Sequence, residues 1–201
     1  MKLVCISRRL LTAFFLLFIP AAHAAEDTIK VGILHSQSGT MAISETALKD
    51  TVLMLIADQN KKGGLLGKKL EPVVVDPASN WDAFTNKAYD LLDKEKVAVV
   101  FGCWTSASRI AVIPVFERLG GLLFYPVQHE GEESSRNVFY TGAAPSQQAL
   151  PAIRYLTSKE GGLTRRWILG TDNVYPRTTN RILSAYLASE GVHADDITTI
   201  Y

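Results

Sequence analysis

The amino-acid sequence predicts an α/β fold built on doubly wound parallel sheets. Short apolar runs alternate with longer segments in which apolar residues recur at the helical period of about 3.6 residues. This alternation is typical of strand–helix units joined by right-handed crossovers into a parallel sheet. Polar, turn-forming stretches follow three of the apolar runs, at residues 35–40, 102–108 and 125–130. Because parallel strands end at one edge of the sheet, we expect these stretches to meet where such folds bind ligands.

The predicted elements of the first unit alternate in type from residue 28 to residue 144. Strands are expected at 28–35, 69–76, 97–101, 122–125 and 138–140, with helices between the first four. Ser44 is the expected N-cap of the first helix, and Gly63–Gly64 ends it. Ser79 or Asn80 opens the second helix. Pro72 has no N–H group and is therefore expected at the start of its strand.

A turn at Gly142–Pro145 is the candidate boundary to a second unit. The elements predicted beyond it are a helix from Pro145 to about Ser158, a strand at 166–170, a helix ending at Gly191 and a strand beginning at Ile197. Two strands and two helices leave apolar faces without a partner in the same unit. We therefore expect the chain to be a truncated form of a longer protein.

The first 24 residues have the pattern of a cleavable secretory signal peptide. Lys2, Arg8 and Arg9 precede an apolar core at 10–19, and Ala22-His23-Ala24 is a small-x-small cleavage site. A membrane anchor is the alternative, but the apolar core is too short to span a bilayer. We therefore expect the mature chain to begin at Ala25 in the periplasm.

Composition excludes several functional classes for the mature chain. Cleavage removes three of 21 basic residues and none of the 20 acidic residues, which leaves no basic excess to bind nucleic acid. The four histidines have no metal-ligand spacing, and neither the dinucleotide fingerprint nor the P-loop motif is present. We therefore expect no metal and no cofactor.

Cys103 is the one candidate nucleophile, with His129 or His35 as its base. A lone cysteine beside a buried strand is more often an inert core residue, so we expect no catalytic residue and no enzyme activity. A cluster of glutamates follows the strand at 122–125, and such runs are usually solvated. Its members are Glu130, Glu132 and Glu133, of which Glu130 could also accept amide N–H bonds.

The polar strand exits predict a ligand site rather than a reaction centre. Trp104, Thr105 and Ser106 follow one strand, and Tyr125 ends the next, so an indole, hydroxyls and a phenol share one edge. The stretch 171–177 of the second unit would face them across a cleft that closes about a hinge. The alternative is that Thr105, Ser106 and Ser108 only cap a helix and Trp104 only packs.

Five stretches of the sequence resemble a known family. They are TIKVGILHSQSGTMAISE, FGCWTSASR, LLFYPVQHEG, NVFYTGAAPSQQ and GTDNVYPRTTNRI. The chain resembles the type I periplasmic solute-binding proteins for urea and short-chain amides, which are receptors of branched-chain-amino-acid-type ABC transporters. The resemblance implies a two-lobed fold, with 25–144 as the first lobe and 145–201 as part of the second. It also implies a small neutral amide ligand that is passed to ABC transporter permease subunits.

Matching positions in this family give the expected ligand-binding residues. They are Trp104, Thr105, Ser106, Tyr125 and Tyr175. The hydroxyls of Thr105 and Ser106, with helix-start N–H groups, are expected to donate to the amide carbonyl, and Glu130 or backbone carbonyls to accept its N–H groups. The aromatic residues would form the walls. Two positions differ from the family pattern, because Asn173 stands where an aromatic residue is usual and His129 where tyrosine is usual. An amidohydrolase using Cys103 and an amide-sensing regulator of the same fold remain as alternatives.

Overall fold

The computed structural model describes residues 28–163 and 165–201, and it has the predicted α/β class. The predicted signal peptide at 1–24 lies outside the described residues. The main sheet is parallel throughout. Its strands are β1 (Ile29–Leu34), β2 (Leu70–Val75), β3 (Val99–Gly102), β4 (Leu123–Tyr125) and β5 (Val138–Tyr140), arranged in the order β2-β1-β3-β4-β5.

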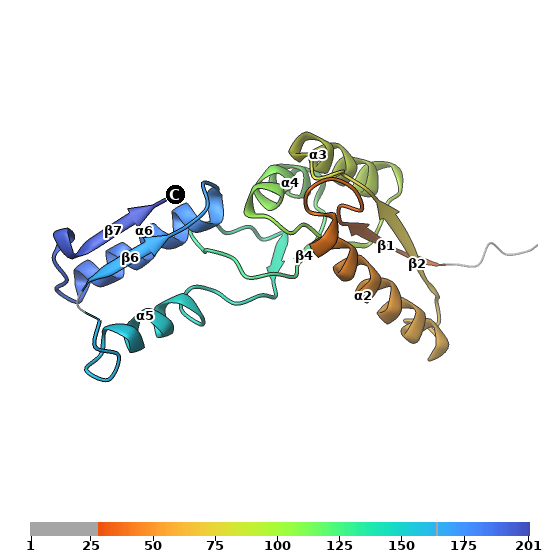
Figure 1. The fold of residues 1–201 in the computed structure, drawn as a ribbon. Coiled ribbons are helices and arrows are strands. Elements are labelled where there is room, and N and C mark those ends of the chain that lie inside the picture. Colours follow the sequence, from red (N-terminus) through yellow and green to blue (C-terminus); the bar gives the residue numbers. More distant parts are fainter. Residues whose placement is uncertain (1–27, 164) are drawn as a thin grey trace, which may run out of the picture.

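Helices cover both faces of this sheet, as a doubly wound fold requires (Figure 1). They are α2 (Ala42–Lys61), α3 (Trp81–Tyr89), which continues as the π-helical turn η1 (Asp90–Lys94), and α4 (Ser106–Leu119). The helices α3 and α4 lie on one face, where Phe84, Leu91 and Phe116 form a buried core with sheet residues. On the opposite face, Ile56 of α2 packs against Val31 and Ile33 of β1. The sheet is thereby held at a fixed place between two apolar layers.

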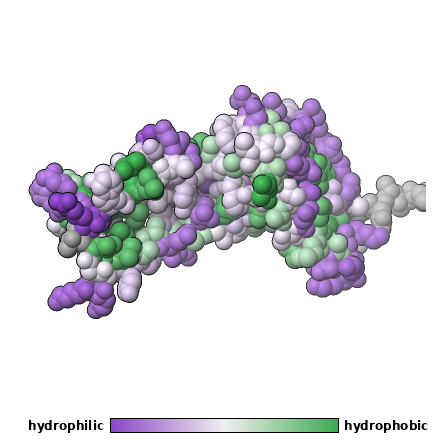
Figure 2. All heavy atoms as spheres, in the orientation of Figure 1, coloured by the Kyte–Doolittle hydropathy of each residue, from purple (hydrophilic) through white to green (hydrophobic). Residues whose placement is uncertain are grey.

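The second unit holds a separate two-stranded parallel sheet (Figure 1). Its elements are α5 (Ala149–Thr157), β6 (Arg166–Leu169), α6 (Val174–Ser189), the 3-10 turn η2 (Ala194–Asp196) and β7 (Ile197–Ile200). Trp167 and Leu169 alternate with the buried Ile168 along β6, and both are more than two-thirds exposed. Figure 2 shows apolar surface over this part of the molecule. One face of the small sheet is therefore left uncovered by the described residues.

Several local predictions are confirmed by the hydrogen bonds that begin and end the helices. The side chain of Asn80 accepts the N–H of Ala83 at 2.9 Å and caps α3. Thr105 caps α4 by accepting the N–H of Ser108 at 3.0 Å. The end of α4 was not predicted: Gly120, with φ of 66°, ends it in the left-handed conformation that glycine adopts without strain.

Four local predictions are wrong. Ser44 lies inside α2, whose N-cap is Met41 and has no side-chain capping bond. The helix expected from Pro145 begins at 149, after a turn. Pro72 is the third residue of β2, which is tolerated because β2 is an edge strand. The helical period of the apolar residues after Ser108 also predicts that Ile110 is buried, but Ile110 is 42% exposed.

The strand order places the loops after β1 and β3 at a topological switch point. From β1 the chain moves to β2 on one side, and the later strands are added on the other side. Open α/β sheets bind ligands at the carboxyl edge beside such a point. Within the described residues, no helix has both the length and the apolar content needed to cross a membrane.

Candidate functional site

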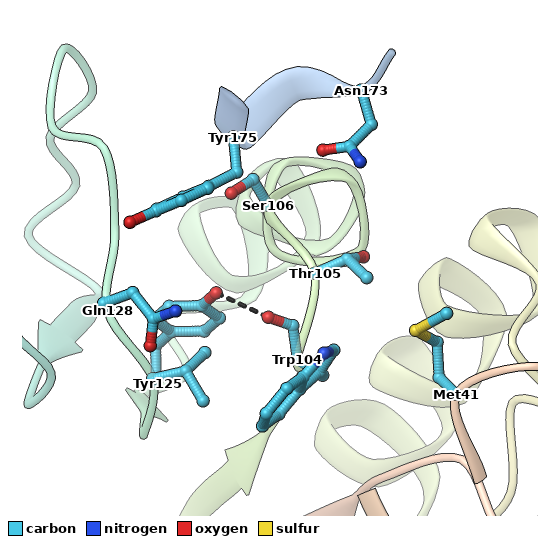
Figure 3. A pocket seen from close by; sticks show the side chains of 9 residues that line it. Met41, Trp104, Thr105, Ser106, Tyr125, Gln128, Asn173 and Tyr175 are labelled. Carbon is cyan, nitrogen blue, oxygen red and sulfur yellow. Dashed lines mark hydrogen bonds between the residues drawn. The ribbon is translucent and has the colours of Figure 1, made fainter. Parts of the chain in front are cut away.

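A cavity of about 240 Å³ opens at this carboxyl edge (Figure 3). All five sequence-predicted residues line it, together with four that were not predicted to bind ligand. The lining residues are Met41, Trp104, Thr105, Ser106, Tyr125, Val127, Gln128, Asn173 and Tyr175. They come from the start of α2, the turn between β3 and α4, the segment after β4, and the start of α6. Both units therefore contribute to one cavity, and the binding role of these residues stays a prediction.

The backbone conformation of two residues directs the turn between β3 and α4 toward the cavity. A Cβ on Gly102 would lie 2.6 Å from the carbonyl oxygen of Leu34, so only glycine allows β3 to pass β1 this closely. Cys103 then adopts a left-handed φ of 67°, which turns the chain out of the sheet. Thr105 follows in extended conformation and begins α4. In the first turn of α4 the N–H of Ser108 is used by Thr105, whereas the N–H groups of Ser106 and Ala107 have no intrahelical partner and are available to a ligand acceptor.

The hydroxyl groups of Ser106 and Tyr125 in the cavity wall are hydrogen-bonded to the protein. The Ser106 hydroxyl donates to Oε2 of Glu130 at 2.7 Å. The Tyr125 phenol donates to the backbone carbonyl oxygen of Trp104 at 2.7 Å. The expectation that Ser106 donates to a ligand carbonyl is therefore wrong for this arrangement, because its single proton is already used.

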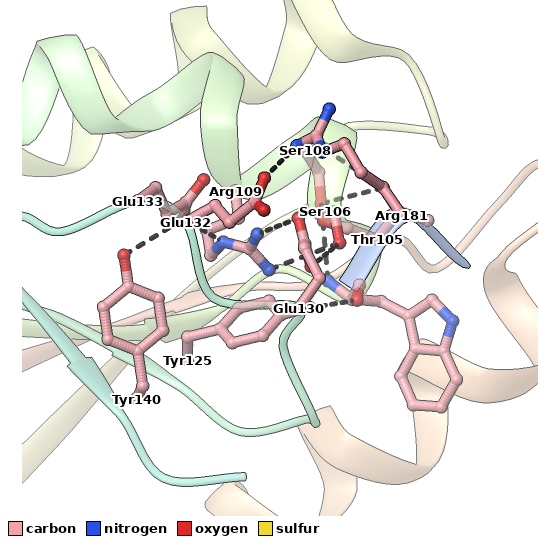
Figure 4. Close-up of polar contacts among 11 residues, drawn as sticks. Thr105, Ser106, Ser108, Arg109, Tyr125, Glu130, Glu132, Glu133, Tyr140 and Arg181 are labelled. Atoms are coloured by element: carbon pink, nitrogen blue, oxygen red, sulfur yellow. Dashed lines mark hydrogen bonds and ion pairs between the residues drawn. The ribbon is translucent and has the colours of Figure 1, made fainter. Parts of the chain in front are cut away.

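Arg109 is the residue that organises this wall, and sequence reasoning missed it (Figure 4). Its side chain is fully buried, and it forms ion pairs with Glu130 at 2.8 Å and with Glu133. The guanidinium carbon also lies 4.7 Å from the ring centroid of Tyr125, within the range of a cation–π contact. The sequence feature that could have indicated this cluster is an arginine one turn after Ser106, with several glutamates further along the chain that could pair with it.

The prediction that the glutamate cluster is solvated is wrong for Glu130. This residue is 2% exposed, because Arg109 and Ser106 satisfy its two oxygens. Glu133 accepts from Arg109 and also, at 3.0 Å, from the phenol of Tyr140. Burial and the nearby charge of Glu133 raise the pKa of Tyr140 to about 12. Three charged groups are thus buried or half-buried directly behind Ser106.

Glu132 of the same segment extends toward the second unit. It forms an ion pair with Arg181 of α6, and both side chains are exposed (Figure 4). The 130–133 segment therefore contacts the first unit through Glu130 and Glu133 and the second unit through Glu132.

The residues considered for catalysis lie outside the cavity. Cys103 is fully buried, and burial raises the pKa of its thiol well above the ordinary value. His129 stacks on Tyr140 with 4.4 Å between ring centroids, and His35 is buried beside Glu45. None of these three residues lines the cavity.

Comparisons with known proteins show the family and the fold of the chain. A family model described as "Periplasmic binding protein domain" matches residues 29–201. The "Leu/Ile/Val-binding protein BraC3" of Rhizobium johnstonii is 28% identical over 144 residues, which is 70% of this chain and 38% of that protein. This chain therefore spans well under half the length of that relative.

Solved structures share the fold over most of the chain. A periplasmic binding protein type 1 from Bordetella pertussis is 25% identical with a TM-score of 0.75, covering 87% of this chain and 49% of that one. The substrate-binding protein LivJ from Streptococcus pneumoniae, solved with isoleucine, is 20% identical with a TM-score of 0.72. It covers 87% of this chain and 50% of the LivJ chain, and at this identity it shows the fold alone.

Proposed function

Because the chain belongs to the periplasmic binding protein domain family, we propose that it is the solute-binding component of an ABC transporter. Its proposed ligand is urea or a short-chain aliphatic amide, bound between the two units. Residues 25–144 would form the first lobe and residues 145–201 part of the second. Export through the leader at 1–24 would place it in the periplasm, with Ala25 as its first residue and permease subunits as its partners.

The observation that supports a neutral ligand is the chemistry of the cavity lining. Among the described residues, no carboxylate, ammonium, guanidinium or imidazole group lines the cavity. The ammonium group of an amino-acid zwitterion placed there would lose hydration without meeting an opposite charge, which is costly. A small amide is uncharged and needs only hydrogen bonds and flat walls. The volume of about 240 Å³ also suits a small solute.

The walls provide both kinds of contact that a planar amide requires. Trp104, Tyr125 and Tyr175 offer aromatic surface, and Gln128 offers a side-chain amide. The unpaired N–H groups at the start of α4 can donate to a carbonyl oxygen. Each neutral hydrogen bond contributes about 1 kcal/mol net, so selectivity depends on leaving no buried group unpaired.

Calorimetric titration of the complete protein with urea, acetamide, leucine and isoleucine tests this proposal. We expect heat of binding with urea or acetamide and none with the amino acids. Ser106→Ala and Tyr125→Ala should each weaken amide binding by about tenfold while keeping a cooperative thermal transition. Binding of leucine or isoleucine without binding of any amide would overturn the ligand assignment. It would also favour the ligand class that is named for the relatives.

A further inference from the structure

Three hydroxyl groups of the cavity, those of Thr105, Ser106 and Tyr125, direct their protons into the protein. A hydroxyl has one proton and two lone pairs, so a hydroxyl that donates to the protein can only accept from a ligand. The partners of Ser106 and Tyr125 leave no ambiguity. A carboxylate oxygen of Glu130 and a backbone carbonyl oxygen can only accept, so each hydroxyl must be the donor at 2.7 Å.

The same reasoning fixes the proton of Thr105. The Ser108 hydroxyl donates to the Thr105 carbonyl oxygen at 2.8 Å, which uses its one proton. The contact of 3.2 Å between the Thr105 and Ser108 hydroxyls must therefore be donated by Thr105. Thr105 Oγ1 also accepts the N–H of Ser108, and one lone pair remains.

Arg109 keeps the Ser106 proton in this direction. It donates to Oε1 of Glu130 at 2.8 Å, which leaves Oε2 facing Ser106. Its Nη1 also lies 3.4 Å from Ser106 Oγ and occupies one of the two lone pairs. Arginine has donors only, so the hydrogen-bond directions among Arg109, Glu130 and Ser106 cannot reverse without breaking a buried ion pair.

We infer that the cavity wall formed by Thr105, Ser106 and Tyr125 is an acceptor surface that selects solutes by their N–H groups. This rests on the proposed function and specifies the ligand class further. The carbonyl oxygen of a primary amide or urea would lie at the N–H groups of α4, and its NH₂ group would donate to the hydroxyl oxygens. A carboxylate of the same shape would place its second oxygen against lone pairs. Glu130 is the residue that sets this specificity, through Ser106.

Acetamide and acetate test the inference because they have nearly the same shape and differ at one position, NH₂ or O⁻. The complete protein is titrated with acetamide, and acetate is added as a competitor. The wild-type protein should bind acetamide and be displaced by acetate only weakly.

The decisive variant is Glu130→Gln. Arg109 can only donate, so the glutamine oxygen should remain on Arg109 and its NH₂ should turn toward Ser106. Ser106 would then accept from the glutamine and point its proton into the cavity. The ratio of acetamide affinity to acetate affinity should fall by at least about tenfold. The matched control is Glu133→Gln, which removes the same charge from the same arginine but has no contact with Ser106. Its affinity ratio should stay within about twofold of the wild-type ratio.

Tyr125→Phe tests the inference if Glu130→Gln shows no cooperative thermal transition. It removes the phenol oxygen without touching the buried ion pairs, and it should weaken acetamide binding about tenfold with no change for acetate. An unchanged ratio in folded Glu130→Gln, or wild-type acetamide affinity in Tyr125→Phe, would overturn the inference alone. Failure of the wild-type protein to bind either urea or acetamide would overturn the proposed function, and the inference with it.

Discussion

Replacing Arg109 by methionine should destabilise the protein strongly, although the change is made in a largely apolar helix face. Methionine fills much of the same volume, but it leaves Glu130 buried at 2% exposure without its cation. Breaking a buried ion pair by removing one partner costs about 3–5 kcal/mol. The cation–π contact with Tyr125 is lost as well, which adds about 0.5–2 kcal/mol.

A chain of this length loses about 2–4 °C of melting temperature for each kcal/mol. Arg109→Met should therefore melt at least about 6 °C below the wild-type protein in thermal scans followed by circular dichroism. Heat is preferable to chemical denaturation here, because urea is also a proposed ligand. Arg181→Met is the matched control: its ion pair with Glu132 is exposed, so the loss should be under about 1 kcal/mol.

A second substitution separates the unpaired charge from lost packing. Arg109→Met combined with Glu130→Leu removes the buried carboxylate as well, so the double variant should be more stable than Arg109→Met alone. If the double variant is instead the less stable, or if Arg109→Met and Arg181→Met melt together, the ion pair is not what makes Arg109 important.

Two further predictions concern the thiol and the pH dependence of stability. Burial raises the pKa of Cys103, so a thiol reagent at pH 8 should label it only after unfolding; rapid labelling of the native protein would contradict its burial. Burial, and then the charge of Arg109, lower the pKa of His129 from 6.5, so the unfolded chain takes up a proton first as the pH falls. The contribution of His129 to stability is therefore full above about pH 6.5 and declines below it. His129→Phe should flatten the decline in melting temperature between about pH 7 and pH 5. An equal slope in both proteins would show that His129 does not cause the decline.

Periodicity and turn chemistry predicted most of the fold because those features are local. The five strands of the main sheet and the caps Asn80 and Thr105 all follow from short stretches of sequence. Ser44 was misplaced as a cap because Ser36 and Glu45, joined by a buried hydrogen bond, connect the end of β1 to the first turn of α2. The backbone there is fixed by a tertiary contact, which a capping pattern does not contain.

The candidate site could be predicted only in part for the same reason. The residue types at 104–106 and 125 indicate aromatic surface and hydroxyl groups at one sheet edge, and the structure brings them to one cavity. Glu130 was predicted only as a possible acceptor for the ligand, and its pairing with Arg109 was not predicted, because a contact across 21 residues leaves no periodic trace. A buried arginine in a helix is visible in the sequence only as an arginine.

The direction in which a hydroxyl group donates its proton is even harder to predict from the sequence. A serine can donate or accept, and Ser106 was first assigned as a donor to a carbonyl on its residue type alone. Its proton is directed by Glu130, whose position is in turn held by Arg109. Two residues behind the cavity surface therefore decide whether Ser106 donates to a solute or accepts from it. Relatives that keep the same hydroxyls but change the buried pair would offer donors in place of acceptors. Ligand class in this fold would then depend on residues that never touch the ligand, and comparing only the cavity lining of two such proteins would miss the difference.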